Sequence, residues 1–219
     1  AYDSYRPAIE LAGGKTIAIA LQVIRDEHGQ VTSYEIPWEI LAKAINTKTR
    51  LLIINTPHNP TGMVWDKTDL DRLAGIVRNT STLILSDEVY EHIIFDGRRH
   101  ESLLRDPELT ARSLVVSSFG KTFHMTGWKI GYCVAPADLM QEFRRVHQYS
   151  QFCVASPLQW ALADYIEGHP EHYAELGAFY EAKRDRFRAL LQTSRLSLQP
   201  ATGTYFQLAD YSAITDVPD

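Results

Sequence analysis

Short apolar runs alternate with longer amphipathic stretches along the first 135 residues of the chain. The short runs are rich in β-branched residues and predict strands at residues 16–21, 51–55, 83–87, 113–118 and 130–135. Between them, residues 38–45 and 67–77 have apolar side chains three and four positions apart, which predicts helices. This alternation is typical of an α/β fold in which a mixed, mostly parallel sheet is covered by helices on both faces.

From residue 136 onward the pattern becomes helical, with amphipathic stretches at 138–149, 157–166 and 170–192. A helix as long as the last one often joins two domains. After it, residues 200–203 form a predicted turn and residues 204–208 are strand-like, which we interpret as the first hairpin of a second domain. We therefore assign residues 1–168 to part of a large domain, and residues 169–219 to an interdomain helix and the start of a smaller, truncated domain.

Composition and charge exclude several classes of protein. The 219 residues are 45% hydrophobic and carry a net charge of −5 without a basic block, so nucleic acid is not an expected partner. The longest charge-free stretch, residues 146–163, contains several polar side chains, so no membrane span is expected. With two cysteines outside any metal or redox spacing, a reducing cytoplasm is the expected location. Both ends read as the interior of a longer protein, so we expect a fragment.

Three predicted strands are each followed by unusual polar residues, and in α/β sheets ligands bind beyond the carboxyl ends of strands. After the strand at 51–55, two prolines stiffen a loop that carries Asn59, and Gly62 permits a turn with positive φ. Asp87 ends the apolar strand at 83–87. If a helical turn begins there, Tyr90 lies on the same face of that turn as Asp87. After the strand at 113–118, Lys121 follows among small residues. The sequence thus predicts one site at this edge of the sheet.

The order Asn-Pro-Thr-Gly, Asp-Glu-x-Tyr and Ser-Phe-x-Lys, followed by Gly-Trp-Lys-x-Gly-Tyr, resembles the fold type I aminotransferases that depend on pyridoxal phosphate (PLP). Asp87 lies 28 residues after Asn59, and Lys121 lies 34 residues after Asp87, which are spacings similar to those of the family. Residues 117–136 and 146–149 are further similar to bacterial methionine aminotransferases of the kynurenine-aminotransferase-like subgroup. The resemblance covers most of the chain and implies the aspartate-aminotransferase-like fold.

The resemblance implies a role for each of these side chains. Lys121 would form the internal Schiff base with PLP and, once released by substrate, would shuttle a proton as general base and acid. Asp87 would pair with the protonated pyridine nitrogen and keep the ring an electron acceptor. Tyr90 and Asn59 resemble the two residues that donate hydrogen bonds to the phenolic oxygen of the ring.

Phosphate binding and ring stacking are implied for three further residues, with two departures from the family pattern. Ser118 and Lys129 correspond to phosphate ligands, although the family usually has arginine where this chain has Lys129, which offers a point charge in place of a planar fork. Gly120 stands where many relatives have serine, so one phosphate hydroxyl is lost. Tyr2 aligns with the aromatic residue that stacks on the PLP ring.

Other parts that the resemblance implies are not located in this sequence. They are a glycine-rich phosphate loop upstream, a tyrosine contributed by a second subunit and a downstream arginine that binds the substrate carboxylate. The full-length protein is therefore expected to work as a homodimer.

Simpler interpretations exist for each residue taken alone. Asp87 could cap a helix and Asn59 could form an Asx turn, while Tyr90 could be packing and Ser118 could bond to the backbone. A metal ligand pair at His169 and His172 lacks a third partner, and no metal is expected. The joint occurrence of the three motifs favours the site.

The sequence therefore predicts a PLP-dependent aminotransferase that moves an amino group from methionine, an aromatic or another large neutral amino acid to a 2-oxo acid. One alternative is a PLP-dependent lyase, acting on cysteine conjugates or resembling aminocyclopropane-carboxylate synthase. Another is a transcriptional regulator that uses such a domain only to sense PLP, because fold does not settle function.

Overall fold

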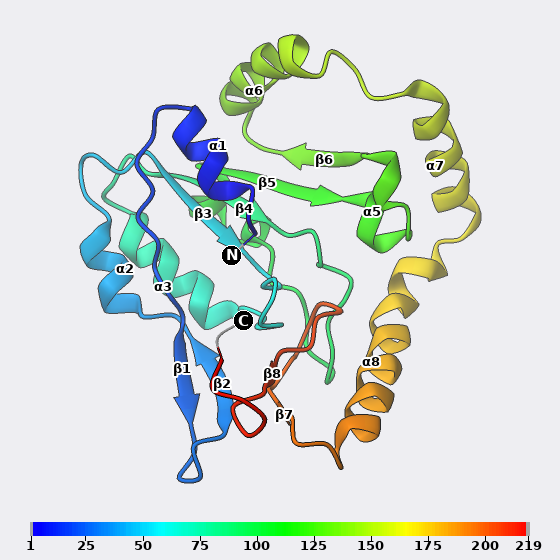
Figure 1. The fold of residues 1–219 in the computed structure, drawn as a ribbon. Helices are drawn as coiled ribbons and strands as arrows, with labels where there is room; N and C mark the ends of the chain where they lie inside the picture. Colours follow the sequence, from blue (N-terminus) through cyan, green and yellow to red (C-terminus); the bar gives the residue numbers. More distant parts are fainter. Residues whose placement is uncertain (1, 218–219) are drawn as a thin grey trace.

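A mixed four-stranded sheet organises the part of the chain that the structure describes, residues 2–217 of a computed structural model. The strand order is β3-β4-β5-β6, with the first three strands parallel and β6 antiparallel to β5 (Figure 1). Their bounds are Leu51–Asn55, Leu83–Asp87, Ser113–Ser118 and Gly131–Val134. These four strands lie where the hydrophobic runs predicted them, and the α/β class with a mostly parallel sheet is confirmed.

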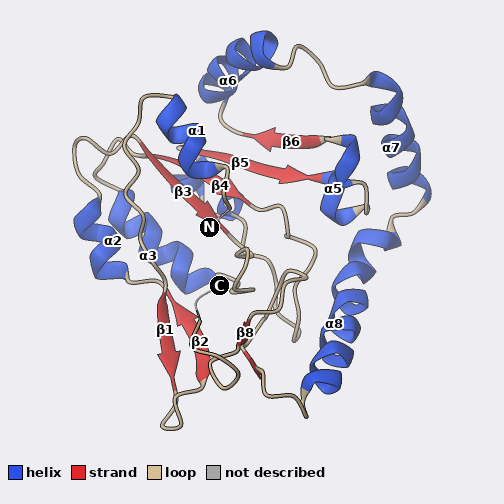
Figure 2. Cartoon of the chain, viewed as in Figure 1, coloured by secondary structure: helices blue, strands red, loops and turns tan. Residues whose placement is uncertain are grey.

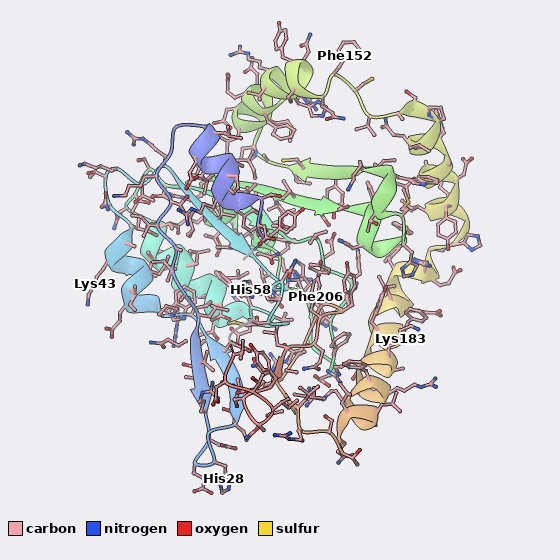
Figure 3. All side chains as sticks on the ribbon, viewed as in Figure 1. His28, Lys43, His58, Phe152, Lys183 and Phe206 are labelled. Carbon is pink, nitrogen blue, oxygen red and sulfur yellow. The ribbon has the colours of Figure 1, made fainter. Side chains whose placement is uncertain are left out.

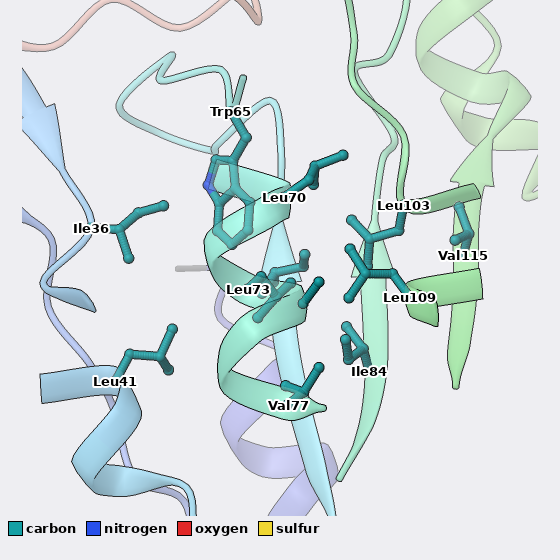
Figure 4. Close-up of a cluster of buried hydrophobic side chains, with 12 residues drawn as sticks. Ile36, Leu41, Trp65, Leu70, Leu73, Val77, Ile84, Leu103, Leu109 and Val115 are labelled. Atoms are coloured by element: carbon teal, nitrogen blue, oxygen red, sulfur yellow. The ribbon is translucent and has the colours of Figure 1, made fainter. Parts of the chain in front are cut away.

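One face of this sheet carries the main hydrophobic core. Alternate strand residues such as Ile84 and Val115 point to this face, where they meet Leu73 and Val77 of the helix α3 (Figure 4). The helix α2 (Trp38–Ala44), the short 3-10 helix η1 (Leu103–Arg105) and α4 (Pro107–Thr110) complete the cover. Because Leu73, Val77 and Ile84 are fully buried, packing on this face holds the strands in register.

The helix α3 (Lys67–Val77) has the bounds that its apolar spacing predicted, and a capping box fixes its start. The backbone N–H of Asp69 donates to Asp66 Oδ1 at 3.0 Å, and the N–H of Asp66 donates to Asp69 Oδ2 at 3.0 Å. Each side chain thus satisfies a backbone donor that the first helical turn leaves free. The cap fixes where the loop after β3 ends.

The opposite face of the sheet is less tightly covered. Along β4 and β5 the residues that point to this face, including Leu85 and Asp87, are only half-buried. The helix α1 (Tyr5–Leu11) lies across β3, β4 and β5 in Figure 1, and its first residue bonds to Asp87. The short helices α5 (Phe119–Thr122) and η2 (Thr126–Trp128) follow β5 at the carboxyl end of the sheet.

Three helices form an arc around β6 and α5, as Figure 2 shows. They are α6 (Ala137–Ser150), α7 (Ser156–Gly168) and α8 (Glu171–Leu191), close to the stretches predicted as helical. Few of their side chains are buried: α6 buries none, and Leu162 and Leu176 are the buried residues of α7 and α8. Phe152, between α6 and α7, projects outward with 77% of its surface exposed (Figure 3). Within the described residues, no helix is long and apolar enough to cross a membrane.

The strand predicted at residues 16–21 is wrong. This segment is extended but unpaired, and its side chains Ile19 and Leu21 pack against the main core. The pairing occurs just after it, where β1 (Gln22–Arg25) and β2 (Val31–Glu35) form an antiparallel hairpin. The apolar pattern of residues 16–21 therefore arises from packing, which strand propensity cannot distinguish from ladder formation.

The predicted hairpin near the end of the chain is partly wrong. The paired strands β7 (Ser197–Leu198) and β8 (Ala209–Asp210) have two residues each, and residues 204–208 form no strand. Instead, the long connection between β7 and β8, residues 199–208, folds back on the first part of the chain; we call it the final connection. Thr202 N donates to Gly62 O at 3.0 Å and Thr204 N donates to Ile93 O at 2.8 Å, so these hydrogen bonds take the place of a longer hairpin ladder. The division at residue 168 stays a prediction.

Two glycines allow this connection to approach the loop after β3. Gly62 has a φ of +70°, as its place in the turn predicted, and a Cβ there would lie 2.8 Å from the carbonyl oxygen of Gly203. A Cβ on Gly203 would lie 2.7 Å from Val64 Cγ2 and 3.0 Å from the carbonyl oxygen of Ile93. Contacts this short require glycine at both positions.

Replacing Gly62 by alanine is expected to destabilise the full-length protein, by about 1–2 kcal/mol from the left-handed conformation alone and further from the clash with Gly203. The matched control is Gly75→Ala, on the exposed side of α3 where a Cβ meets nothing within 4 Å. That change is expected to stabilise by about 0.5–1 kcal/mol. Thermal unfolding midpoints of the two variants should move in opposite directions; a neutral Gly62→Ala would contradict the contact.

Candidate active site

The carboxyl ends of β3 and β4 are joined at the point where the candidate residues begin. Asn55 and Asp87 are register partners in the parallel ladder. The side-chain amide of Asn55 donates to the carbonyl oxygen of Asp87 at 3.0 Å, and the backbone N–H of Thr56 donates to the same oxygen at 3.1 Å. Asn55 is buried, so these bonds are shielded from water. The loop that carries Asn59 therefore starts beside Asp87.

The loop from Asn55 to Gly62 is held by its own polar groups. Asn55 Oδ1 accepts from the backbone N–H of Asn59 at 2.7 Å, and His58 Nδ1 hydrogen-bonds Thr61 Oγ1 at 2.8 Å. Burial lowers the pKa of His58 to about 4, so its ring is neutral at physiological pH. His58 is thus used to hold the loop, and the Asn59 side chain is half-buried at its tip.

Asp87 is the last residue of β4, and each of its carboxylate oxygens has a donor. Oδ1 accepts from the backbone N–H of Val89 at 3.2 Å, and Oδ2 accepts from the phenol of Tyr5. A turn follows, closed by a bond from Glu91 N to Glu88 O at 2.9 Å, but it does not continue into a helix. Asp87 therefore does not cap a helix. The turn buries Tyr90, which is 3% exposed.

Lys121 lies in the one-turn helix α5 and lines a cavity of about 280 Å³. The other lining residues come from three parts of the chain: Gly120, His124, Thr126, Tyr180 and Tyr205. The Lys121 amine lies 5.7 Å from the centre of the Tyr205 ring. An amine that opens into a cavity at a strand end can react with a small carbonyl compound.

Tyr90 links this cavity to Asp87. Its ring meets that of Tyr205 edge to face, with centroids 5.3 Å apart. Burial raises the pKa of Tyr90, and its interactions with Tyr205 and with the charge of Asp87 raise it further. The phenol therefore stays protonated and can donate a hydrogen bond. Tyr90 thus lies between Asp87 and Tyr205, which lines the cavity with Lys121, and a single site that joins the three residues stays a prediction.

Three residues predicted to contact phosphate or the ring are placed less directly. Ser118 caps α5: its hydroxyl accepts from Gly120 N at 3.1 Å and donates to Ile130 O at 3.4 Å. The backbone-bonding alternative for this serine therefore holds in the structure. Lys129 is exposed in the left-handed region, with φ 57°. Tyr2 is 53% exposed and meets Tyr5 edge to face, with centroids 5.7 Å apart. The phosphate and stacking roles stay predictions.

The geometry around Gly120 accounts for one departure from the family pattern. A Cβ at this position would lie 2.9 Å from Thr126 Cα. A serine would therefore require the backbone of η2 to move away. Glycine is the residue that fits this close approach.

Sequence reasoning missed several side chains of the site. Tyr205 and Tyr180 line the cavity, and Tyr5 bonds to Asp87. Tyr180 and Tyr205 come from α8 and the segment after it, more than 50 residues beyond Lys121, so no local pattern links them to the lysine. Figure 3 places Phe206, next to Tyr205, near the middle of the molecule with His58. Only the folding of the final connection onto the sheet reveals this.

A buried carboxylate beside the site fixes the turn after β4. Glu88 is 1% exposed; its Oε2 lies 2.6 Å from His100 Nε2, and its Oε1 accepts from the hydroxyl of Ser86 at 2.9 Å and from Leu103 N at 3.1 Å. Burial alone would raise the pKa of Glu88. The hydrogen bond and the charge of His100, together with the bond from Leu103 N, hold this pKa below its usual value. Glu88 thus ties the residue after Asp87 to the segment before η1.

The mixed, mostly parallel sheet agrees with the fold of the fold type I aminotransferases that the sequence motifs resemble. The chain belongs to the aminotransferase class I and II family, whose model matches residues 1–217. This family match indicates pyridoxal phosphate as the cofactor.

The chain is similar to named aminotransferases. It is 47% identical to a methionine aminotransferase of Escherichia coli (strain K12), over 100% of this chain and 54% of that protein. It is 35% identical to a kynurenine–oxoglutarate transaminase of Dictyostelium discoideum, over 97% of this chain and 52% of that protein. A solved structure of an Escherichia coli protein with methionine aminotransferase function superimposes with a TM-score of 0.93 at 47% identity, covering 100% of this chain and 55% of that one. The chain spans about half the length of the relatives it matches.

Glu88→Gln is expected to lower the free energy of unfolding by about 2–3 kcal/mol near pH 7, because a charged hydrogen-bonded partner is lost in a buried place. The folded-state pKa of Glu88 is depressed, so its contribution is present above the unfolded value of about 4.3 and is lost as the pH falls through the lower folded value.

Denaturant unfolding of the full-length protein at several pH values measures this difference. The gap between wild type and Glu88→Gln should close on acidification. Glu27→Gln, whose side chain is 85% exposed in the β1–β2 hairpin, is the matched control and should leave unfolding unchanged. A gap that widens as the pH falls would contradict the assignment.

Proposed function

We propose that this chain carries the coenzyme-binding part of a PLP-dependent aminotransferase that acts on methionine, an aromatic or another large neutral amino acid. The observation that carries the proposal is the Lys121 amine, which opens into a cavity beside Tyr90 and the strand end that holds Asp87. The family match and the 47% identity to a methionine aminotransferase support the reaction class and the donor.

The residues present fit pyridoxal phosphate chemically. When bound, PLP supplies an aldehyde that reacts with amines and a ring that accepts the electrons left when a Cα proton departs. The site offers a matching donor set: a primary amine at Lys121, a carboxylate at Asp87 and a protonated phenol at Tyr90. A cavity of about 280 Å³ at Lys121 leaves space for a small molecule beside the amine.

Lys121 acts in two ways in this proposal. Its amine would hold the coenzyme by condensing with the aldehyde, with loss of water. The same amine, freed when a substrate amine takes its place, would accept the substrate Cα proton as general base and donate it to the aldehyde carbon of the coenzyme as general acid. Gly120 leaves the backbone of α5 close against Thr126, so the helix that carries the amine is firmly placed. An arginine could do neither step, because its guanidinium stays protonated.

Asp87, Tyr90 and Asn59 orient and polarise the coenzyme. Asp87 would hold the protonated ring nitrogen, and its carboxylate would favour the positive charge there. Tyr90 and Asn59 would donate hydrogen bonds to the phenolic oxygen of the ring. Tyr90 suits this because its raised pKa keeps it a donor. Lys129 and Ser118 would hold the phosphate, and Tyr2 would stack on the ring. The Ser118 hydroxyl would then have to serve both the phosphate and the Gly120 N–H that it accepts from in the α5 cap.

The aromatic part of the cavity lining supports a large neutral donor. Tyr205 and Tyr180 form an aromatic wall opposite the Lys121 amine, with their ring centroids 5.7 Å apart. Such a wall contacts thioether or aromatic side chains favourably and offers no charge to pair with an acidic one. Amino acids and 2-oxo acids are therefore the substrates in this proposal; a homodimer and a cytoplasmic location remain predictions of it.

Borohydride reduction of the PLP-loaded full-length protein, followed by peptide mapping, is expected to place a pyridoxyl adduct on Lys121. Lys121→Ala should show no adduct at that peptide and lose at least about 1,000-fold in kcat/KM, because both the covalent anchor and the proton carrier are gone. Lys43→Ala, on the exposed surface of α2, is the matched control and should keep both. An adduct on another lysine would contradict the assignment of Lys121 as the residue that binds PLP covalently.

Product analysis separates the reaction classes. With methionine and a 2-oxo acid, a transferase should release one equivalent of the oxo acid of methionine for each amino acid formed from the acceptor. Ammonia and pyruvate from a cysteine conjugate would instead support the lyase. A Lys121 adduct without turnover of either kind would support a sensing role.

A further inference from the structure

The phenol of Tyr5 reaches Asp87 from 82 residues away in the sequence. It donates a hydrogen bond to Asp87 Oδ2, while the backbone N–H of Val89 donates to Oδ1 at 3.2 Å. The carboxylate is therefore hydrogen-bonded by the first residue of α1 at one oxygen and by the turn after β4 at the other. The sequence predicted a role in the site for Tyr2, as the residue that stacks on the ring, but Tyr5 is the tyrosine that contacts the Asp87 carboxylate.

Local structure holds Tyr5 in this position. It is the first residue of α1, so helical backbone geometry sets the direction of its side chain. The ring of Tyr2 meets its ring edge to face, at 5.7 Å between centroids and 77° between planes. This contact limits rotation of the Tyr5 ring and steers its hydroxyl toward the end of β4.

The chemistry of the pair leaves room for one more partner. A carboxylate offers about four lone-pair directions, and the bonds from Tyr5 and Val89 use two of them. A neutral phenol that donates to a carboxylate stabilises its charged form without neutralising it. Burial raises the pKa of Tyr5, and the bond to Asp87 raises it further, so the hydroxyl keeps its proton.

We propose that Tyr5 is a positioning residue for Asp87, holding one carboxylate oxygen so that the remaining lone pairs face the ring nitrogen of bound pyridoxal phosphate. The inference rests on the proposed function, because it presumes that Asp87 binds that nitrogen. Tyr5 itself touches Asp87 in the structure and acts through it. Without the hydroxyl, Asp87 would be held only by Val89 and would lose part of its alignment.

A double-mutant cycle on the PLP dissociation constant tests this. Tyr5→Phe in the full-length protein removes the hydroxyl and keeps the ring that packs on Tyr2. It is expected to weaken PLP binding about 10- to 100-fold, the range for a hydrogen bond to a charged group. In an Asp87→Asn background the same change should alter the dissociation constant by less than about threefold, because the residue through which Tyr5 acts is already altered.

The matched control is Tyr211→Phe, which also removes one phenol hydrogen bond, to the carbonyl oxygen of Val217 at 2.9 Å, but far from Asp87 in the sequence and outside the cavity. It should leave PLP affinity within about twofold of wild type. Thermal unfolding of the PLP-free proteins shows whether Tyr5→Phe retains the fold.

Two results would overturn the inference: an unchanged dissociation constant in Tyr5→Phe, or an equal loss in the Asp87→Asn background, which would mean that Tyr5 only supports the fold. Borohydride mapping of the wild type keeps this distinct from the proposed function. If Lys121 carries the adduct and Tyr5→Phe binds PLP normally, the inference alone fails; if Lys121 carries none, the proposed function fails.

Discussion

The parallel register of β3 and β4 is the constraint on which the site depends. It places Asn55 opposite Asp87, and the Asn55 amide donates to the Asp87 carbonyl oxygen at 3.0 Å. Because Oδ1 of the same Asn55 side chain accepts from Asn59 N at 2.7 Å, one buried side chain sets the positions of two candidate coenzyme ligands. The core beneath, with Ile84 fully buried between the strands and α3, prevents a slip of the register. A shift by one residue would turn Asp87 to the other face of the sheet.

The amino-acid sequence predicts the parts of this molecule that obey local rules. The four strands of the main sheet and the helix α3 follow their apolar periodicity, and Gly62 adopts the positive φ that its turn predicted. Asp87 and Lys121 could be found because Asp87 ends one strand and Lys121 lies three residues after the next, where the carboxyl ends of parallel strands meet. The family resemblance then supplied roles that the spacing alone does not contain.

What the sequence could not predict depends on contacts between distant segments. Residues 16–21 have a strand-like pattern, but they pair with no strand of the described residues 2–217, and the packing of Ile19 and Leu21 explains their apolar character. Tyr5 and Tyr205 reach the site from opposite ends of the chain, and a tyrosine in isolation is more often packing than function. Nothing local marks them, because their partners are 82 and 84 residues away: Asp87 for Tyr5 and Lys121 for Tyr205.

The bonds between the final connection and the sheet have a mechanical consequence. Thr202 is bonded on both sides, since its N–H donates to Gly62 O and its carbonyl oxygen accepts from Phe95 N at 2.9 Å. Arg184 of α8 adds a two-pronged grip on Asp96, with both nitrogen–oxygen distances 2.8 Å. These bonds connect α8 and the final connection to the segments that follow β3 and β4. Thr202 lies three residues before Tyr205, so its bonds keep the Tyr205 ring beside the cavity that Lys121 lines, and a displacement of α8 would have to break the Arg184–Asp96 pair.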